Sequence, residues 1–505
     1  MLIPQSICFM AKIAVIGSGF SGLSAAAYLS AAGHDVHVFE KNETAGGRAR
    51  QLKTESGYVF DMGPSWYWMP NVFEEFFNEF GYHISDFYEL KLLNPSFNMV
   101  FEDGVVPVCA EYSKIRQLFE SIEKGSGHRL DQFMKEAQFK YETAMKKLPA
   151  MPGISISEFA DKELLKGLAR LQIFSSFSKH VRKYFANPKL IALMEFPVLF
   201  LGAMPQETPA LYSLMNYACL KLGSWYPIGG FGKVINSMVK VAEAKGAAFH
   251  YNSSVEKILV EDNRATSVMV NGKQIIFDAI VASADYHHVE QLLPTPYRNY
   301  SENYWNKKTL APSALIYYLG INKKIKSLSH HTLFFDEDLE QHSMEIYKDP
   351  KWPGKPLFYV CCPSKTDDRV APQNHENLFL LMPIAPGLPD DNSIREKYFK
   401  IMMGRLQKHI GEEITERIDF KKSYCVNDFV ADYNSYKGNA YGLANTLMQT
   451  AILKPKIRNK KIENLFYAGQ LTVPGPGVPP SLISGKIAAQ QLLKHLKSKK
   501  HEAII

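Results

Sequence analysis

Residues 12–50 read KIAVIGSGFSGLSAAAYLSAAGHDVHVFEKNETAGGRAR. The stretch opens with the apolar run 13–16, which predicts a buried parallel strand. Gly17, Gly19 and Gly22 follow in the G-x-G-x-x-G spacing. The first glycine permits a tight turn, the second lets the backbone approach a pyrophosphate, and the third lets the next helix pack close to the strand. The stretch therefore predicts a dinucleotide site at the edge of a parallel sheet.

The residues after the glycines continue this pattern. A helix is expected over 21–32, with Gly33 at its end and a second strand over 36–39. The N-terminus of the helix would face phosphates, so Phe20 and Ser21 are candidate cofactor residues. Glu40 ends the second strand, where an acid accepts a hydrogen bond from the adenosine ribose, and Lys41 follows it. The acid disfavours NADP, whose 2′-phosphate it would repel. The alternative to a dinucleotide site is a glycine turn in an ordinary βαβ unit.

Composition narrows the possible classes of protein. The chain has 505 residues, with 46% hydrophobic and 22% charged residues, typical of a globular protein with more than one core. The net charge is +7, and part of the excess lies in the segment 494–500. That segment is either a solvated helix end or a site for anionic lipid head groups. No basic stripe with interleaved aromatics is visible, so nucleic acid binding is not expected.

The cysteines and the hydropathy pattern add further expectations. The six cysteines form no C-x-x-C pair and no zinc spacing, so we predict free thiols and no metal site. No apolar run reaches the length of a membrane span, and no signal peptide is recognisable. Met10 would serve as well as Met1 as the natural start.

Aromatic residues mark a candidate substrate wall. The turn signal Asp61-Met62-Gly63-Pro64-Ser65 is followed directly by Trp66-Tyr67-Trp68. Two tryptophans beside the cofactor turn are either a wall for a flat apolar ligand or plain core. The apolar segment 196–202 is likewise either a domain core or a rim that contacts a membrane or a hydrocarbon. The candidate substrate residues are Trp66, Trp68, Phe196, Phe200 and Trp225.

The C-terminal part of the chain contains a second group of candidate cofactor residues. A strand is expected over 465–468, followed by a glycine and proline loop and a helix from about residue 480. The helix N-terminus would offer N–H groups to a flavin or a pyrophosphate. Candidate cofactor residues in this loop are Gly469, Gln470, Gly477 and Val478. Many flavoproteins carry an acid where this chain has Gln470, so that contact would be neutral or come from elsewhere.

Two resemblances to known proteins indicate the family to which these patterns point. Gly46-Gly47-Arg48 resembles the Gly-Gly pair that lies along FAD phosphates in two-dinucleotide-binding-domain flavoproteins, although Arg48 alone could be a surface arginine. With residues 61–65, 225–230, 434–443 and 474–480, the chain resembles bacterial-type phytoene desaturases, carotenoid desaturases among the amine-oxidase-like flavoproteins. The resemblance implies FAD as cofactor and adds the candidate cofactor residues Gly47, Arg48, Gly63, Pro64, Ser65 and Val255.

The resemblance also implies an architecture. We predict an α/β fold with a Rossmann-type FAD-binding domain built from discontinuous segments, an α+β substrate domain and a helical lid. The FAD-binding domain would comprise residues 12–65, 225–290 and 450–497. Residues 66–224 and 291–449 would form the substrate and membrane-associating domain.

The implied activity is the stepwise dehydrogenation of phytoene toward lycopene, with hydride transfer to FAD. The protein would mainly have to position the substrate and keep water out of the cavity. The sequence does not reveal the proton acceptor, the oligomeric state or the number of steps. The expected location is cytoplasmic, at the inner face of an anionic membrane from which a hydrophobic polyene is drawn.

Several rival functions share these motifs. A carotenoid isomerase, a hydroxycarotenoid desaturase or a carotenoid-oxygenating enzyme would carry the same cofactor residues. An amine oxidase is disfavoured because no covalent-flavin cysteine motif is visible. From a different class, GDP-dissociation-inhibitor proteins use this fold to bind prenylated GTPases without flavin. Gly22, the Gly46-Gly47 pair and the intact C-terminal loop argue against that alternative.

Overall fold

A parallel sheet is built around the first predicted strand. The computed structural model describes residues 10–147, 172, 175–199 and 201–502. Five parallel strands pair in the order β19-β13-β1-β2-β9. They are β1 (Lys12–Ile16), β2 (Asp35–Phe39), β9 (Ala248–His250), β13 (Ala279–Ala282) and β19 (Leu465–Tyr467). Strands from both ends of the chain therefore meet in one sheet.

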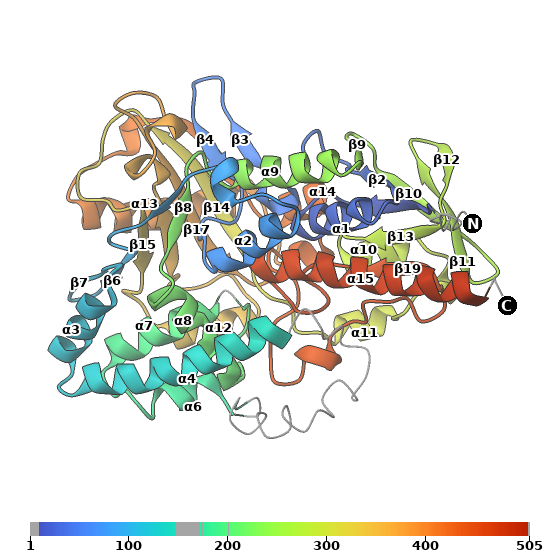
Figure 1. Cartoon of the computed structure of the whole chain (residues 1–505). Coiled ribbons are helices and arrows are strands. Elements are labelled where there is room, and N and C mark those ends of the chain that lie inside the picture. Colours follow the sequence, from blue (N-terminus) through green and yellow to red (C-terminus); the bar gives the residue numbers. More distant parts are fainter. Residues whose placement is uncertain (1–9, 148–171, 173–174, 200, 503–505) are drawn as a thin grey trace.

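The two faces of this sheet are covered differently. Ile13 and Val15 of β1 pack toward three helices, which Figure 1 shows side by side: α1 (Phe20–Ala31), α9 (Phe231–Ala244) and α15 (Val478–Glu502). Ala14 and Ile16 point to the other face, because successive side chains of a strand alternate. That face carries an antiparallel three-stranded sheet and two short helices, β10 (Val255–Glu261), β11 (Arg264–Val270), β12 (Lys273–Ile276), α10 (Tyr286–Gln291) and α11 (Glu302–Asn306).

A second, larger sheet stands beside the first. Its seven strands pair in the order β18-β14-β17-β16-β15-β6-β7. They are β6 (Phe97–Phe101), β7 (Gly104–Val108), β14 (Ser313–Ile321), β15 (His331–Phe334), β16 (Phe358–Cys361), β17 (Glu376–Ile384) and β18 (Ile418–Tyr424). Helix α13 (Asn392–Ile410) covers one face through Tyr398, Phe399 and Met402. The opposite face turns toward the parallel sheet, and it includes Ile316, Leu333 and Tyr359.

Helices cover the end of the second sheet. Figure 1 places α3, α4, α6, α7 and α8 together below and beside β6 and β7. They are α3 (Tyr112–Ile122), α4 (Ser126–Lys147), α6 (Phe177–Val181), α7 (Pro188–Leu199) and α8 (Leu214–Leu220). The remaining elements are β3 (Gln51–Lys53), β4 (Val59–Asp61), α2 (Pro70–Glu79), β5 (Leu90–Leu92), β8 (Trp225–Pro227), α12 (Leu339–Tyr347) and α14 (Val426–Tyr433).

The structure confirms the α/β fold class and most of the expected elements. The helix over 21–32 is α1, the strand over 36–39 is β2, and Gly33 adopts a φ of 85° after the helix. The expected strand over 465–468 and the helix from 480 are β19 and α15. Among the described residues, no helix is long and apolar enough to cross a bilayer. The cysteines in the described ranges are all free, and Cys8 lies outside those ranges. The domain boundaries stay a prediction.

Small residues bring α15 against α1. A Cβ added to Gly485 of α15 would lie 2.1 Å from the carbonyl oxygen of Ser21. Real side chains do not approach a backbone oxygen that closely, so only glycine permits this helix contact. Gly404 of α13 is a matched contrast, because a Cβ there would meet nothing within 4 Å.

Gly485→Ala should therefore lower the thermal stability of the protein, by about 1–3 kcal/mol for an overpacked contact. Gly404→Ala should leave the stability unchanged or raise it by about 0.5–1 kcal/mol, because alanine is the better helix former. Melting curves followed by circular dichroism compare the two variants. Equal effects of the two substitutions would contradict the close contact of α1 and α15.

Candidate functional site

One large cavity contains nearly all of the predicted cofactor residues. It begins at the carboxyl ends of β1 and β2 and extends over the inner face of the seven-stranded sheet. Ligands of open α/β sheets bind outside the carboxyl ends of the strands, so this is the expected place. The predicted residues that line it are Gly17, Gly19, Phe20, Ser21, Glu40, Lys41, Gly47, Arg48, Gly63, Pro64, Ser65, Val255, Gly469, Gln470, Gly477 and Val478.

The second and third glycines of the motif, Gly19 and Gly22, have different environments. Gly22 does not line the cavity. A Cβ on Gly22 would lie 2.0 Å from the carbonyl oxygen of Gly17, so this glycine allows α1 to pack against the turn after β1. A Cβ on Gly19 would meet no protein atom within 4 Å. Gly19 has a φ of −72°, which any residue can adopt. The protein alone therefore gives no reason for glycine at position 19, whereas a ligand at the N-terminus of α1 would.

Glu40 is held by its own chain. Its Oε2 accepts hydrogen bonds from the backbone N–H and the hydroxyl of Ser18, at 3.0 and 2.7 Å. Its Oε1 accepts from the backbone N–H and the side-chain amide of Asn42, both at 2.9 Å. These bonds orient a buried carboxylate at the end of β2, where the sequence predicted an acceptor for a ribose hydroxyl. Val255 lines the same end of the cavity, and its predicted place beside adenine stays a prediction.

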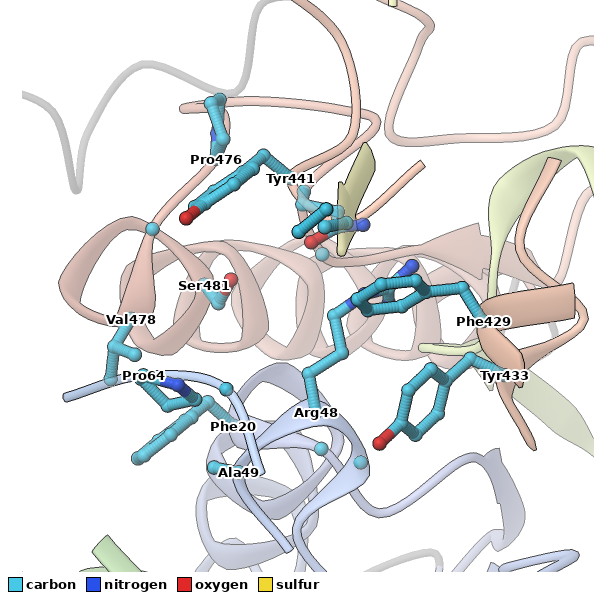
Figure 2. A pocket seen from close by; sticks show the side chains of 18 of the residues that line it. Phe20, Arg48, Ala49, Pro64, Phe429, Tyr433, Tyr441, Pro476, Val478 and Ser481 are labelled. Carbon is cyan, nitrogen blue, oxygen red and sulfur yellow. The ribbon is translucent and has the colours of Figure 1, made fainter. Parts of the chain in front are cut away.

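Arg48 lies within a polar cluster at the cavity wall, not on the open surface. Its Nη2 donates to Ser435 Oγ at 2.9 Å and to the carbonyl oxygen of Asn439 at 3.2 Å. The side-chain amide of Gln470 lies beside the same nitrogen, and with its oxygen turned toward Arg48 it accepts a hydrogen bond from Nη2 at 3.0 Å. The Tyr433 ring lies 5.1 Å from the guanidinium carbon, and Figure 2 shows the two side chains close together in the lining of the pocket. Gln470 therefore contacts a cation where many flavoproteins have an acid.

Electrostatics at this cluster involve a second buried group that the sequence did not single out. Burial lowers the pKa of Arg48, and the negative charge of Asp285 opposes that shift. Burial also raises the pKa of Asp285, which caps α10 by accepting from the His288 N–H at 3.3 Å. Asp285 and Tyr433 both line the cavity. Tyr433 immediately precedes the segment 434–443 that carried the family resemblance. The resemblance could therefore have indicated that this region contributes to the site.

Three of the five predicted substrate residues lie together at the other part of the cavity. Trp66, Trp68 and Phe196 line it, and their rings pack with centroid separations of 5.3–6.1 Å. Phe200 lies outside the described residues. Trp225 does not line the cavity. It lies in β8, where it pairs with Leu92 of β5, and its Nε1 donates to the carbonyl oxygen of Leu222 at 2.8 Å. The sequence could not show that Trp225 differs from Trp66 and Trp68, since its place depends on the pairing of β8 with β5.

The apolar segment after residue 195 is part of the interior. Phe196 and Val198 of α7 are 1% and 0% exposed, which supports a core more than a membrane rim for the described part of this segment. The cavity floor beneath it is also apolar. Its wall includes Ile316, Leu333 and Leu381 from the seven-stranded sheet. A long apolar cavity thus joins the dinucleotide motif to an aromatic wall.

Titratable side chains are few in the apolar part. Tyr359 lines the cavity, and its hydroxyl lies 2.6 Å from His331 Nδ1 and donates to Ser65 Oγ at 3.0 Å. His331, His330 and Cys361 are buried, with one potential ligand atom of each within 4.8 Å of the others. The sequence did not single out these three, because only the pairing of β15 and β16 brings Cys361 to the two consecutive histidines. The expectation of no metal stays a prediction.

Comparisons with known proteins agree with this geometry. Residues 20–493 match the family described as flavin containing amine oxidoreductase. A carotenoid 3,4-desaturase of Haloarcula japonica is 40% identical over 96% of this chain and 98% of its own length. A zeta-carotene-forming phytoene desaturase of Myxococcus xanthus is 29% identical over 95% and 94%. A solved oxidoreductase from Methanosarcina mazei shares the fold, with a TM-score of 0.61, 17% identity and coverage of 96% and 100%.

The fold and the cavity define an FAD-dependent oxidoreductase. The chain belongs to the flavin containing amine oxidoreductase family, and within it to the carotenoid desaturases. The resemblance seen in the sequence is therefore confirmed at the level of the family and the cofactor. The specific carotenoid and its product are a narrower question.

The residues present fit FAD. The open space at Gly19, the N-terminus of α1 and the oriented carboxylate of Glu40 suit a pyrophosphate and a ribose. Arg48 and the backbone after Gly469 would hold the flavin end from the other side of the same cavity. When bound, FAD would supply the two-electron oxidation, whereas the protein positions the substrate and excludes water.

Gly19→Ala tests this fit directly. The added methyl group meets no protein atom, so the melting temperature of the FAD-free protein should be unchanged. FAD affinity should fall by about 10- to 100-fold, because the methyl group would overlap the cofactor. Titration of flavin fluorescence measures the affinity, with Gly404→Ala as the matched control. An unchanged affinity would show that the cofactor backbone does not approach Gly19.

Proposed function

We propose that this protein desaturates a carotenoid by removing two hydrogens from adjacent carbons, with FAD as the oxidant. Two substrates are candidates. Stepwise dehydrogenation of phytoene toward lycopene is the reaction that the sequence motifs imply. Formation of a 3,4 double bond in a carotenoid is the second candidate, because the carotenoid 3,4-desaturase of Haloarcula japonica shares more identity with this chain than the phytoene desaturase of Myxococcus xanthus.

The observation that carries the proposal is the continuity of the cavity. Cofactor residues such as Gly19 and apolar residues such as Trp68 and Leu333 line the same space. A linear hydrocarbon beside a flavin needs such a space, because it offers no polar group for orientation and is placed by shape alone. The burial of Phe196 and Leu333 also excludes water from this part.

Membrane association is a separate part of the proposal. Lys494 and Lys497 are exposed on the last turns of α15, whereas Lys499 Nζ lies 3.3 Å from Glu463. Exposed basic residues are attracted to anionic head groups by about 1 kcal/mol each near the surface. We propose peripheral binding to the inner, anionic face of a membrane, from which the apolar substrate would enter.

Product analysis tests the catalytic proposal. FAD-loaded protein is incubated without oxygen with phytoene and, separately, with a conjugated carotenoid whose 3,4 bond is saturated. We expect a product lighter by two hydrogens from one of them, detected by chromatography and mass spectrometry, together with loss of the oxidised flavin spectrum. A product of unchanged mass would favour a carotenoid isomerase, and a product with added oxygen would favour an oxygenating enzyme.

Vesicle binding tests the membrane proposal. The wild-type protein should sediment with vesicles that contain anionic lipid and much less with neutral vesicles. Lys494→Glu with Lys497→Glu should weaken the anionic binding by about 10-fold or more, from the loss of about 1 kcal/mol per lysine and the added repulsion. The matched control is Lys397→Glu with Lys400→Glu, which makes the same charge change on α13 at the other end of the molecule. Equal losses for both pairs would contradict a specific role for α15.

A further inference from the structure

We propose that Lys454 supplies a buried positive charge to the FAD site, where it stabilises the reduced form of the cofactor. The inference deepens the proposed function and rests on it, because a hydrocarbon is a weak hydride donor and needs a strongly oxidising flavin. Lys454 is not among the candidate residues that the sequence singled out. It lies directly behind the loop 474–480, which supplies Gly477 and Val478 to the cavity wall.

The side chain of Lys454 packs against this loop at Gly475. A Cβ added to Gly475 would lie 3.1 Å from Lys454 Cε and 3.0 Å from Asn445 Oδ1, closer than most Cβ atoms come to their neighbours. Gly475 has a φ of 135°, which residues with a side chain rarely adopt. The next two residues, Pro476 and Gly477, line the cavity, and Figure 2 shows Pro476 there. The lysine stem is therefore separated from the cofactor end by one loop.

Hydrogen bonds hold the segment that carries Lys454 beside this part of the site. The carbonyl oxygen of Pro455 accepts from the Thr472 hydroxyl at 2.6 Å. The carbonyl oxygen of Ile457 accepts from the Tyr467 N–H, in β19, at 2.8 Å. The segment thus runs along β19 and the turn that follows it, and that turn also lines the cavity. The place of the lysine is therefore fixed by the backbone as well as by its stem.

The amine of Lys454 is buried without a partner. The residue is 2% exposed, and its Nζ has no hydrogen-bond partner among the described residues. Asn445 Oδ1, which faces the same glycine, is likewise buried and unpaired. Lys140 is a contrast, because its buried Nζ donates three hydrogen bonds of 3.0–3.1 Å. Burying an unpaired amine is costly, and the contacts within the chain do not offset that cost for Lys454.

Such an amine responds strongly to charge in the adjacent site. Burial, and after it the like charge of Lys308, lower the pKa of Lys454 to about 7. A hydride brings two electrons and one proton, so accepting it adds one unit of negative charge to a flavin ring. A cation one loop away attracts that charge, and the charge in turn raises the pKa of the amine. A protonated Lys454 therefore favours reduction and makes the bound flavin a stronger oxidant.

A second buried cation at the flavin end acts in the same direction. The hydrogen bonds of Arg48 within the described part of the chain go to neutral groups, those of Ser435, Asn439 and Gln470. Asp285 is the acid whose charge reaches this guanidinium. Gln470 takes the place of an acid that many flavoproteins have. The flavin end thus has one buried cation in its wall and one behind its loop.

Lys454→Met tests this charge, with Lys456→Met as the matched control. Lys456 allows the same charge change two residues further along, where its Nζ donates to the carbonyl oxygen of Ile452 at 3.4 Å. The midpoint potential of bound FAD is measured by reductive titration without oxygen and without carotenoid, against a reference dye. Lys454→Met should bind the reduced form about tenfold less well relative to the oxidised form, which lowers the two-electron potential by about 30 mV. Lys456→Met should keep the wild-type potential.

A second variant leaves the lysine in place. Asn445→Asp adds a carboxylate of the same shape beside the same glycine, where it would pair with the ammonium and cancel its charge. The potential should fall in the same direction, and this variant decides the question if Lys454→Met does not retain FAD.

Two results would overturn the role of Lys454. They are a wild-type potential in FAD-loaded Lys454→Met or Asn445→Asp, and an equal shift in Lys456→Met. The titration involves no carotenoid, so it is independent of the substrate. A wild-type protein that oxidises no polyene, with the expected potentials in all variants, would instead overturn the proposed function.

Discussion

The close contact of small residues between the two ends of the chain is the constraint on which the site depends. Gly22 lets α1 approach the turn after β1, and Gly485 lets α15 approach Ser21 of α1. Larger residues would push both helices outward, because a Cβ at either position would overlap backbone oxygen. Since α1 and α15 both begin at the cavity, their approach sets the width of the cofactor end. Figure 2 shows Val478, at the start of α15, next to Pro64 in the lining of the pocket.

Polar and apolar functions occupy different parts of one cavity. The cofactor end contains oriented hydrogen bonds and charges, such as those of Glu40 and Arg48. The part over the seven-stranded sheet consists mostly of aliphatic and aromatic walls, and the Tyr359 hydroxyl lies between His331 and Ser65. This separation is physically reasonable, because a dinucleotide is recognised through directional bonds, whereas a hydrocarbon is recognised through shape and the exclusion of water.

Local patterns predicted residues that the fold brings to one end of the cavity. The glycine spacing, the strand before it and Glu40 after the second strand all act within about thirty residues, so sequence alone reveals them. Residues 464–480 were recognisable for the same reason. The partners of Arg48 were harder to predict, because Ser435 and Asn439 lie nearly four hundred residues away in the chain. Trp225 was predicted from its place beside a glycine motif, but it pairs with Leu92 of β5 and does not line the cavity.

The sequence by itself determined the parallel sheet, the dinucleotide site and the desaturase family, because each depends on short-range spacing and hydrophobic periodicity. Only the tertiary structure decided which residues line the apolar part of the cavity. The pairing of β15 with β16 brings Tyr359 to His331, and the loop after β4 brings Ser65 to both. Such contacts depend on strand register and on long-range packing, which no local pattern of residues records.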